Sequence, residues 1–244
     1  MFFDDALSKT ILDLGELVYQ EPPPSVLCQF LATRICPSGE LVRVCVGRVD
    51  RDGFIRPTAS FGYPVDSKLM ETEIPLESNR PLPEAIKQKK IILLNKEDIL
   101  ERYPEYQPID MRSPWASSAL VPTMGIYAFA FLSQQKIIEK EFYEIYYKIV
   151  GQLLSFYNFD RAMTINKLVE TDGWISKISE PQPKKGGALT ERQKQILDQI
   201  KEKKTNGQIA EHLGYSESLI RQETIIIYAK LGIKGRKELI IKNF

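Results

Sequence analysis

The eight residues from Glu180 to Gly187 divide this chain of 244 residues into two parts that are expected to fold separately. They contain two prolines, two glycines and no apolar side chain, a composition typical of a linker between domains. We therefore predict an α+β domain over residues 1–168, a linker over 169–187 and an all-α domain over 188–244. The chain is long enough for two modest domains.

The charge of the chain is distributed unevenly between these parts. Residues 184–244 contain 13 basic and 7 acidic side chains, a net charge of +6, whereas the other residues carry a net charge of −5. A small basic unit behind an acidic one is typical of proteins in which one domain contacts nucleic-acid phosphates. Such clustering also arises by chance, so the charge distribution alone does not identify a nucleic-acid-binding domain.

The composition argues against several kinds of catalytic or metal site. His212 is the only histidine, which removes most histidine-based triads, metal clusters and phosphorelays. The three cysteines, Cys28, Cys36 and Cys45, contain no CxxC pair and predict neither a disulfide framework nor a zinc site. We expect no catalytic residues, no metal, no cofactor and no enzymatic activity.

The sequence also predicts a cytoplasmic protein with no membrane partner. The first residues do not resemble a signal peptide. The most apolar stretch, residues 118–132, contains Pro122 and Gly125 and is too short to cross a bilayer.

Before the linker, helical and strand patterns follow one another in an order typical of an antiparallel sheet with flanking helices. Asp50-Arg51-Asp52-Gly53 predicts a hairpin turn, because aspartate and glycine tolerate the positive φ angles of such turns. Strands are predicted at residues 41–49, 54–61, 71–76, 91–94, 116–121 and 126–132. Helices are predicted in two patches within residues 5–35, separated by Pro22-Pro23-Pro24, and at 83–90, 96–103 and 139–168.

The predicted helix over residues 139–168 carries more apolar surface than one domain face needs. Pairing with the same helix of a second copy would cover this surface. We therefore expect a homodimer through residues 139–168, which would place the two C-terminal units side by side.

After the linker, helix-start and helix-stop residues alternate at short spacing. Thr190 and Thr205 each stand three residues before a glutamine, as in a capping box, and Ser216 is a third N-cap. Gly214 and Gly232 end the second and third helices. A fourth short helix is predicted over 236–242. A tight glycine turn between the second and third helices is typical of a helix-turn-helix that enters the major groove.

This C-terminal segment resembles the LuxR/FixJ-type helix-turn-helix family over nearly its whole length. The order, spacing and cap residues of several short motifs agree with the family. They are Leu189-Thr190-Glu191-Arg192, Thr205-Asn206-Gly207-Gln208-Ile209-Ala210, Leu213-Gly214-Tyr215-Ser216-Glu217-Ser218, Tyr228-Ala229-Lys230-Leu231-Gly232-Ile233, and Arg236 with Leu239. The resemblance implies binding to double-stranded DNA.

The start of the third helix departs from the family, so its DNA sequence is expected to differ. Leu219-Ile220-Arg221 replaces the family's Thr-Val-Lys, Glu223 stands in place of a common histidine, and Ile225 replaces a polar or basic residue. We predict that Arg221 reads guanine, Gln222 reads adenine and Ile225 contacts a thymine methyl group. Glu223 would either accept a hydrogen bond from the cytosine amino group or only repel phosphate. Phosphate contacts are predicted from Thr205, Asn206, Ser216, Ser218, Lys230 and Arg236.

The N-terminal part resembles a GAF sensory domain over roughly residues 8–165. The resemblance is carried by Asp50-Arg51-Asp52-Gly53 with Phe61-Gly62-Tyr63-Pro64, Pro83-Glu84-Ala85-Ile86 with residues 91–94, and Ser118-Ala119-Leu120-Val121-Pro122. GAF domains bind varied small molecules or only dimerise, so the fold names no ligand. A covalent bilin is not expected, because no Cys-His pair exists. Phe61, Tyr63, Trp115 and Ser117 are candidate pocket residues, with a plain core as the alternative.

Together these patterns predict a bacterial, dimeric transcription regulator whose N-terminal domain senses a small molecule or a partner. The alternative is a GAF-like interaction module that binds no ligand and recruits RNA polymerase or another regulator. A response regulator fits poorly, because Asp50 and Asp52 lie in a hairpin and not at the end of a buried strand.

Overall fold

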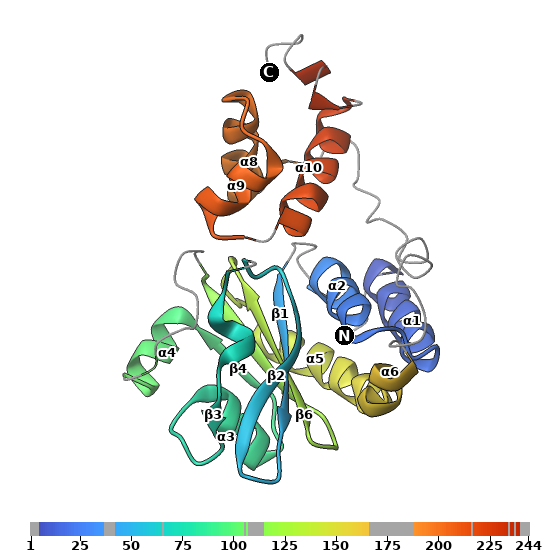
Figure 1. Ribbon diagram of the computed structural model, residues 1–244, viewed down its shortest axis with the longest axis vertical. Helices are drawn as coiled ribbons and strands as arrows, with labels where there is room; N and C mark the ends of the chain where they lie inside the picture. Colours follow the sequence, from blue (N-terminus) through green and yellow to red (C-terminus); the bar gives the residue numbers. More distant parts are fainter. Residues whose placement is uncertain are drawn as a thin grey trace. The chain divides into compact units, whose positions relative to one another are not determined.

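A computed structural model describes residues 5–36, 42–64, 66–104, 106, 115–165, 188–215, 217–233, 235–236 and 238–239 of the chain. Its contacts divide the chain into two compact units. The first contains the sheet and helices α1 to α6, and the second contains α8 to α10 (Figure 1). The linker predicted at 169–187 lies outside the described residues, so the predicted domain boundaries stay predictions.

The first unit is built on an antiparallel sheet of six described strands in the order β3-β2-β1-β6-β5-β4. Their bounds are β1 (Arg43–Val49), β2 (Phe54–Phe61), β3 (Ile74–Pro75), β4 (Ile92–Asn95), β5 (Ser117–Pro122) and β6 (Tyr127–Ser133). The predicted sheet is therefore confirmed. The strand expected over 71–76 is mostly wrong, because a 3₁₀ turn, η1 (Lys68–Glu71), precedes a β3 of only two residues.

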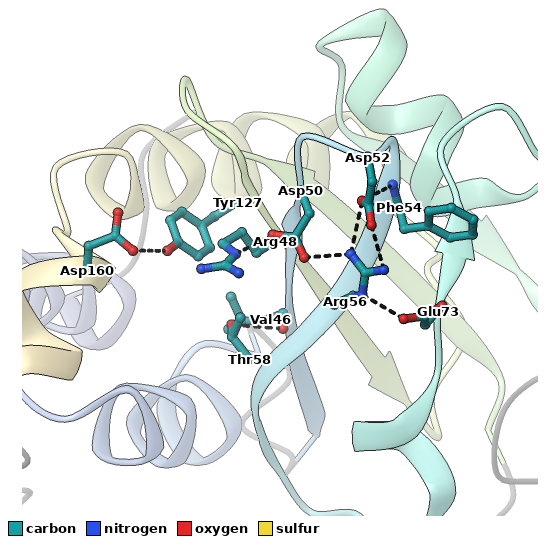
Figure 2. A network of polar contacts seen from close by, with 10 residues as sticks. All are labelled: Val46, Arg48, Asp50, Asp52, Phe54, Arg56, Thr58, Glu73, Tyr127 and Asp160. Carbon is teal, nitrogen blue, oxygen red and sulfur yellow. Dashed lines mark hydrogen bonds and ion pairs between the residues drawn. The ribbon is translucent and has the colours of Figure 1, made fainter.

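The predicted β1–β2 hairpin forms at Asp50–Gly53, where Gly53 has a φ of +83°. Arg56 fastens this hairpin: its guanidinium contacts Asp50 and Asp52 in the turn and Glu73 beside β3, at 2.7–2.8 Å (Figure 2). These hydrogen bonds from Arg56 lower the pKa of the Asp52 carboxyl, and, with Arg48, that of Asp50. The turn is thus tied to the edge strand of the sheet.

Four helices cover one face of the sheet (Figure 1). They are α1 (Asp5–Tyr19), α2 (Pro24–Arg34), α5 (Lys140–Leu154) and α6 (Phe159–Ile165). Helices α2 and α5 contact the strands, and α1 packs against α2 and α5. The main core lies here and includes Val44, Val46, Phe129 and Phe131 from the sheet. Burial of such side chains is the main source of the domain's stability.

The opposite face is covered by α3 (Pro81–Gln88) and α4 (Lys96–Arg102). A second apolar cluster fills the space under them, formed by Ala85, Ile92, Leu94, Ile99, Tyr103, Trp115 and Leu120. The Tyr103 hydroxyl donates to Glu84 Oε2 at 2.7 Å, which satisfies its polar end inside this cluster.

The prediction of a single long helix over residues 139–168 is wrong, because the structure has two separate helices there, α5 and α6. Helix α5 ends at Leu154, and α6 begins at Phe159 after Asn158, whose side chain accepts a hydrogen bond from the Arg161 amide at 3.0 Å. This is an N-cap contact that starts a new helix. Residues 166–168 lie outside the described part of the chain.

Helix α6 is fastened to the body of the domain. The Tyr127 hydroxyl on β6 donates to Asp160 at 3.0 Å (Figure 2), and its ring stacks on Phe159 with centroids 4.1 Å apart. Burial, and then the bond to Asp160, raise the pKa of Tyr127 to about 12. Arg161 forms an ion pair with Glu21, between α1 and α2, at 3.0 Å.

The second unit contains α8 (Glu191–Lys201), α9 (Asn206–Leu213) and α10 (Glu217–Leu231). Both predicted capping boxes are present, at Thr190 and Thr205. Of the predicted fourth helix, the described residues show one turn, in which the amides of Glu238 and Leu239 donate to Gly235 O. None of the helices in the described segments of either unit is long and apolar enough to cross a membrane.

Candidate nucleic-acid interface

The candidate interface is organised by the turn between α9 and α10. Gly214 ends α9 with a φ of +68°, in the left-handed region that favours glycine. The next residue, Tyr215, is buried, and its amide donates to Ala210 O at 2.9 Å. The Arg192 guanidinium of α8 lies 5.8 Å from the centre of the Tyr215 ring. This turn therefore sets the direction in which α10 leaves α9.

Helix α10 has one buried face and one exposed face. Leu219, Ile220 and Ile227 are buried against α8 and α9. Arg221 is exposed, and Ile225 follows one turn later with 37% of its surface exposed. Gln222 lies at the boundary and is half-buried. The structure thus places Arg221 and Ile225 together on the outer surface, with Gln222 beside them.

Glu223 does not belong to this outer surface, and the expectation that it reads bases is corrected. Its side chain is completely buried, and its carboxylate forms an ion pair with Arg192 Nε at 2.5 Å. Gln193 Nε2 donates to the other carboxylate oxygen at 2.9 Å. A buried charge is retained only when it is paired and hydrogen-bonded, so Glu223 fastens α10 to α8.

The polar network around Glu223 extends to both ends of the domain. Gln193 Oε1 accepts hydrogen bonds from the Thr190 amide at 3.2 Å and from Lys230 Nζ at 2.9 Å. Lys230 Nζ also donates to Ala188 O at 2.9 Å. Sequence reasoning found Gln193 only as a capping residue. Its position in a capping box did not reveal that the same amide also contacts α10.

The predicted phosphate-contacting residues differ in the hydrogen bonds that they already make within the domain. The Thr205 hydroxyl accepts from the Gln208 amide and caps α9, so its own proton is available to a phosphate. Arg236 donates to Lys204 O at 2.6 Å and to Asn206 Oδ1 at 3.2 Å. Lys230, Arg236 and Asn206 therefore already bind atoms of the domain itself, and their phosphate contacts remain predictions. Ser216 and the side chain of Ser218 lie outside the described residues.

The candidate pocket residues of the first unit do not converge. Phe61 packs against the core under α2 and α5, whereas Trp115 belongs to the cluster on the opposite face of the sheet. The Ser117 hydroxyl donates to Gln135 O at 2.6 Å and borders a cavity of only about 10 Å³. Tyr63 follows β2 and is half-buried. The prediction of a single pocket lined by these four residues is therefore wrong.

The cysteines of the first unit are all buried and unbridged. Burial raises the pKa of the Cys45 thiol to about 12, and burial together with Cys45 raises that of Cys28. Both thiols stay protonated at neutral pH and are poor nucleophiles.

Comparison with known proteins assigns the second unit. Residues 187–242 match the family model described as bacterial regulatory proteins, luxR family. The C-terminal unit is a LuxR-family DNA-binding domain. A helix-turn-helix of this family after a GAF-like domain is the architecture of a DNA-binding transcription regulator. No curated protein matches the chain.

Solved structures assign the fold of the first unit. The GAF domain of an Acinetobacter phosphoenolpyruvate-protein phosphotransferase has a TM-score of 0.51 at 12% identity and covers 69% of this chain and 99% of its own. The corresponding Coxiella burnetii domain has a TM-score of 0.49 at 12% identity, covering 67% and 99%. Free methionine-R-sulfoxide reductase of Neisseria meningitidis has a TM-score of 0.48 at 16% identity, covering 69% and 96%. The first of these shows a GAF-like fold for the domain that precedes the LuxR-type domain, and no more.

Proposed function

We propose that this protein is a homodimeric transcription regulator that reads the major groove with the outer face of α10. The observation that carries the proposal is the separation of that helix into a buried face and an exposed face starting with Arg221, directly after the Gly214 turn. The first turns of a recognition helix are where base edges are met.

Arg221, Gln222 and Ile225 each suit a different base. The Arg221 guanidinium can donate two hydrogen bonds to guanine, the Gln222 amide can pair with adenine, and Ile225 can touch a thymine methyl. The Thr205 hydroxyl and the N-terminus of α9 suit a phosphate. Ser216, Ser218, Asn206, Lys230 and Arg236 complete the proposed set of phosphate contacts.

Selection of binding sites from random duplexes by the full chain tests this function. We expect enrichment of one short motif that contains a guanine, present twice with fixed spacing because two α10 helices bind together. Recovery of unenriched sequence at low salt, where non-specific binding is strongest, would contradict sequence reading by this domain.

The dimer is proposed to form through an exposed apolar face on α1 and α5. Leu12 of α1 is 69% exposed and Ile145 of α5 is 50% exposed, and Phe142 and Ile149 beside Ile145 are only half-buried. The two helices pack together, with Leu153 Cδ2 3.9 Å from the position of a β-carbon on Gly15. Exposed apolar surface of this kind commonly marks an interface. Within the predicted helix over residues 139–168, only α5, which ends at Leu154, contributes to this face.

Replacing Leu12 and Ile145 together by glutamate is expected to convert the dimer into a monomer in analytical ultracentrifugation. Four charges would then face each other across the dimer axis. Affinity for a two-half-site duplex is expected to fall by at least about a hundredfold, since the second unit loses its effective concentration. Affinity for a single half-site should be unchanged.

Leu100→Glu provides the matched control. Leu100 is 52% exposed on α4, across the sheet from α5, so this variant should sediment and bind DNA like the parent. Dimers that persist in the double variant would show that another surface joins the two copies.

The GAF-like domain is proposed to pass a signal to the DNA-binding domains through this dimer. A ligand or partner can do so only if it binds two dimer arrangements with different affinity. Native mass spectrometry of freshly purified protein distinguishes the two input mechanisms: a bound small molecule favours a sensor, and its absence favours the ligand-free module that recruits RNA polymerase.

A further inference from the structure

A groove of about 500 Å³ lies in the first unit, beside the helix that carries the proposed dimer face. One wall is α5 from Glu144 onward together with its C-cap Ser155, and the other walls are the turn after α3 and the β5–β6 turn. Its volume lies within the range of small-molecule sites. It contains none of the four pocket residues expected from the sequence.

The walls of the groove are held in place by the protein's own hydrogen bonds. The Met124 amide of the β5–β6 turn donates to Ser155 Oγ at 3.0 Å, and Ser155 Oγ donates to Gly151 O at 2.7 Å. Gly151 lets α5 lie close to β5, because a β-carbon there would stand 2.8 Å from Val121 Cγ1. The turn and the helix thus form a preorganised concave surface.

Three ammonium groups face this surface from two separate elements. Lys89 and Lys90 come from the turn after α3, and Lys148 comes from α5. All three are exposed, and in the described parts of the chain none forms an ion pair. Glu144 is the one acidic residue of the lining, so the groove carries a net charge of +2. Lysine ammonium groups bind phosphate as point charges.

The conformation of Lys89 is unusual for a residue with a side chain. Lys89 caps α3 in the left-handed region with a φ of +50°, a position at which helices usually carry glycine. In this conformation Lys89 joins Lys90 and Lys148 at the groove.

The rest of the lining contains apolar side chains beside the polar residues Thr123, Gln152 and Ser155. Ile91 and Pro122 line the groove, and Met124 at its edge is 79% exposed. An occupant would therefore combine adjacent negative charges with an apolar or aromatic body. We propose that this groove binds a small organic phosphate of nucleotide size. The proposal goes beyond DNA reading and dimerisation and requires neither.

The test follows the methyl signal of Met124 by NMR in full-length protein with ¹³C-labelled methionine methyl groups. The probes are adenosine diphosphate, inorganic pyrophosphate and adenosine, and Met124→Leu assigns the signal. We expect the two phosphate probes to shift the Met124 signal and adenosine to leave it in place. Met70 on η1, which is also exposed, is the internal control and should not move.

Variants that remove a charge from the groove test whether its lysine side chains bind the phosphate. Lys148→Gln should weaken pyrophosphate binding about fivefold, and Lys89→Gln with Lys148→Gln about 25-fold. Glu144→Gln should strengthen binding about fivefold. Lys140→Gln removes the same charge from α5 outside the groove lining and should leave affinity unchanged.

Two results would overturn the proposal. One is a Met124 signal that neither phosphate probe shifts, and the other is a shift that persists unchanged in the double lysine variant. Neither result would affect the selection of DNA sites, so failure of the groove and failure of the proposed DNA reading are distinguishable.

Discussion

Replacing Glu223 by alanine is expected to unfold the C-terminal domain while the GAF-like domain stays folded. The substitution leaves the buried guanidinium of Arg192 without its carboxylate, and the side-chain amide of Gln193 loses its acceptor. Removing one partner of a buried pair costs about 3–5 kcal/mol, which is a large share of the total stability of a small domain.

Hydrogen exchange of the full chain, followed by mass spectrometry, measures this effect. Amides around Ile196 and Ile200, which are buried in α8, should lose protection in Glu223→Ala, whereas those of β1 and β6 should keep it. Glu211→Ala removes an exposed carboxylate from α9 and should change nothing. Parent-like protection in Glu223→Ala would mean that the pair with Arg192 does not hold the helices together.

The double variant Arg221→Ala, Gln222→Ala is expected to lose sequence-selective binding while remaining folded. Each good side chain–base pair supplies about 1–3 kcal/mol of discrimination, so the double change should cost at least about a factor of 30 in affinity for the selected site. Affinity for unrelated duplex DNA should fall much less, since it depends on the remaining positive charge.

Arg221→Lys separates base reading from charge. Lysine keeps the positive charge but not the planar, two-pronged donor geometry of arginine. Titration of labelled duplexes should therefore show weaker discrimination at one guanine and nearly unchanged binding to unrelated DNA. A double alanine variant that is folded and still selects the same DNA sites as the parent would contradict the assignment of α10 as the helix that reads the bases.

The sequence predicted those elements whose signals are local. β2 has the predicted bounds, because a turn with glycine and aspartate precedes it and a glycine follows it. The N-termini of α8 and α9 were predicted by Thr190 and Thr205, whose capping contacts lie within three residues. Such signals need no knowledge of the tertiary structure.

The wrong predictions share a dependence on distant contacts. Apolar spacing over residues 139–168 is compatible with one helix, and the contact that holds α6 as a separate helix comes from Tyr127 on β6, far away in the sequence. Trp115 and Ser117 are two residues apart, yet Trp115 precedes β5 and packs on the opposite face of the sheet. Strand alternation predicts a common face only inside a strand.

The inward side chain of Glu223 has a consequence for how the preference of such a protein for DNA can change during evolution. Because Glu223 is fixed to α8 by Arg192 and Gln193, α10 cannot rotate about its own axis without breaking a buried pair. New operators would then be acquired by exchanging outward residues such as Arg221 and Ile225, one base contact at a time, around a helix whose orientation is inherited unchanged.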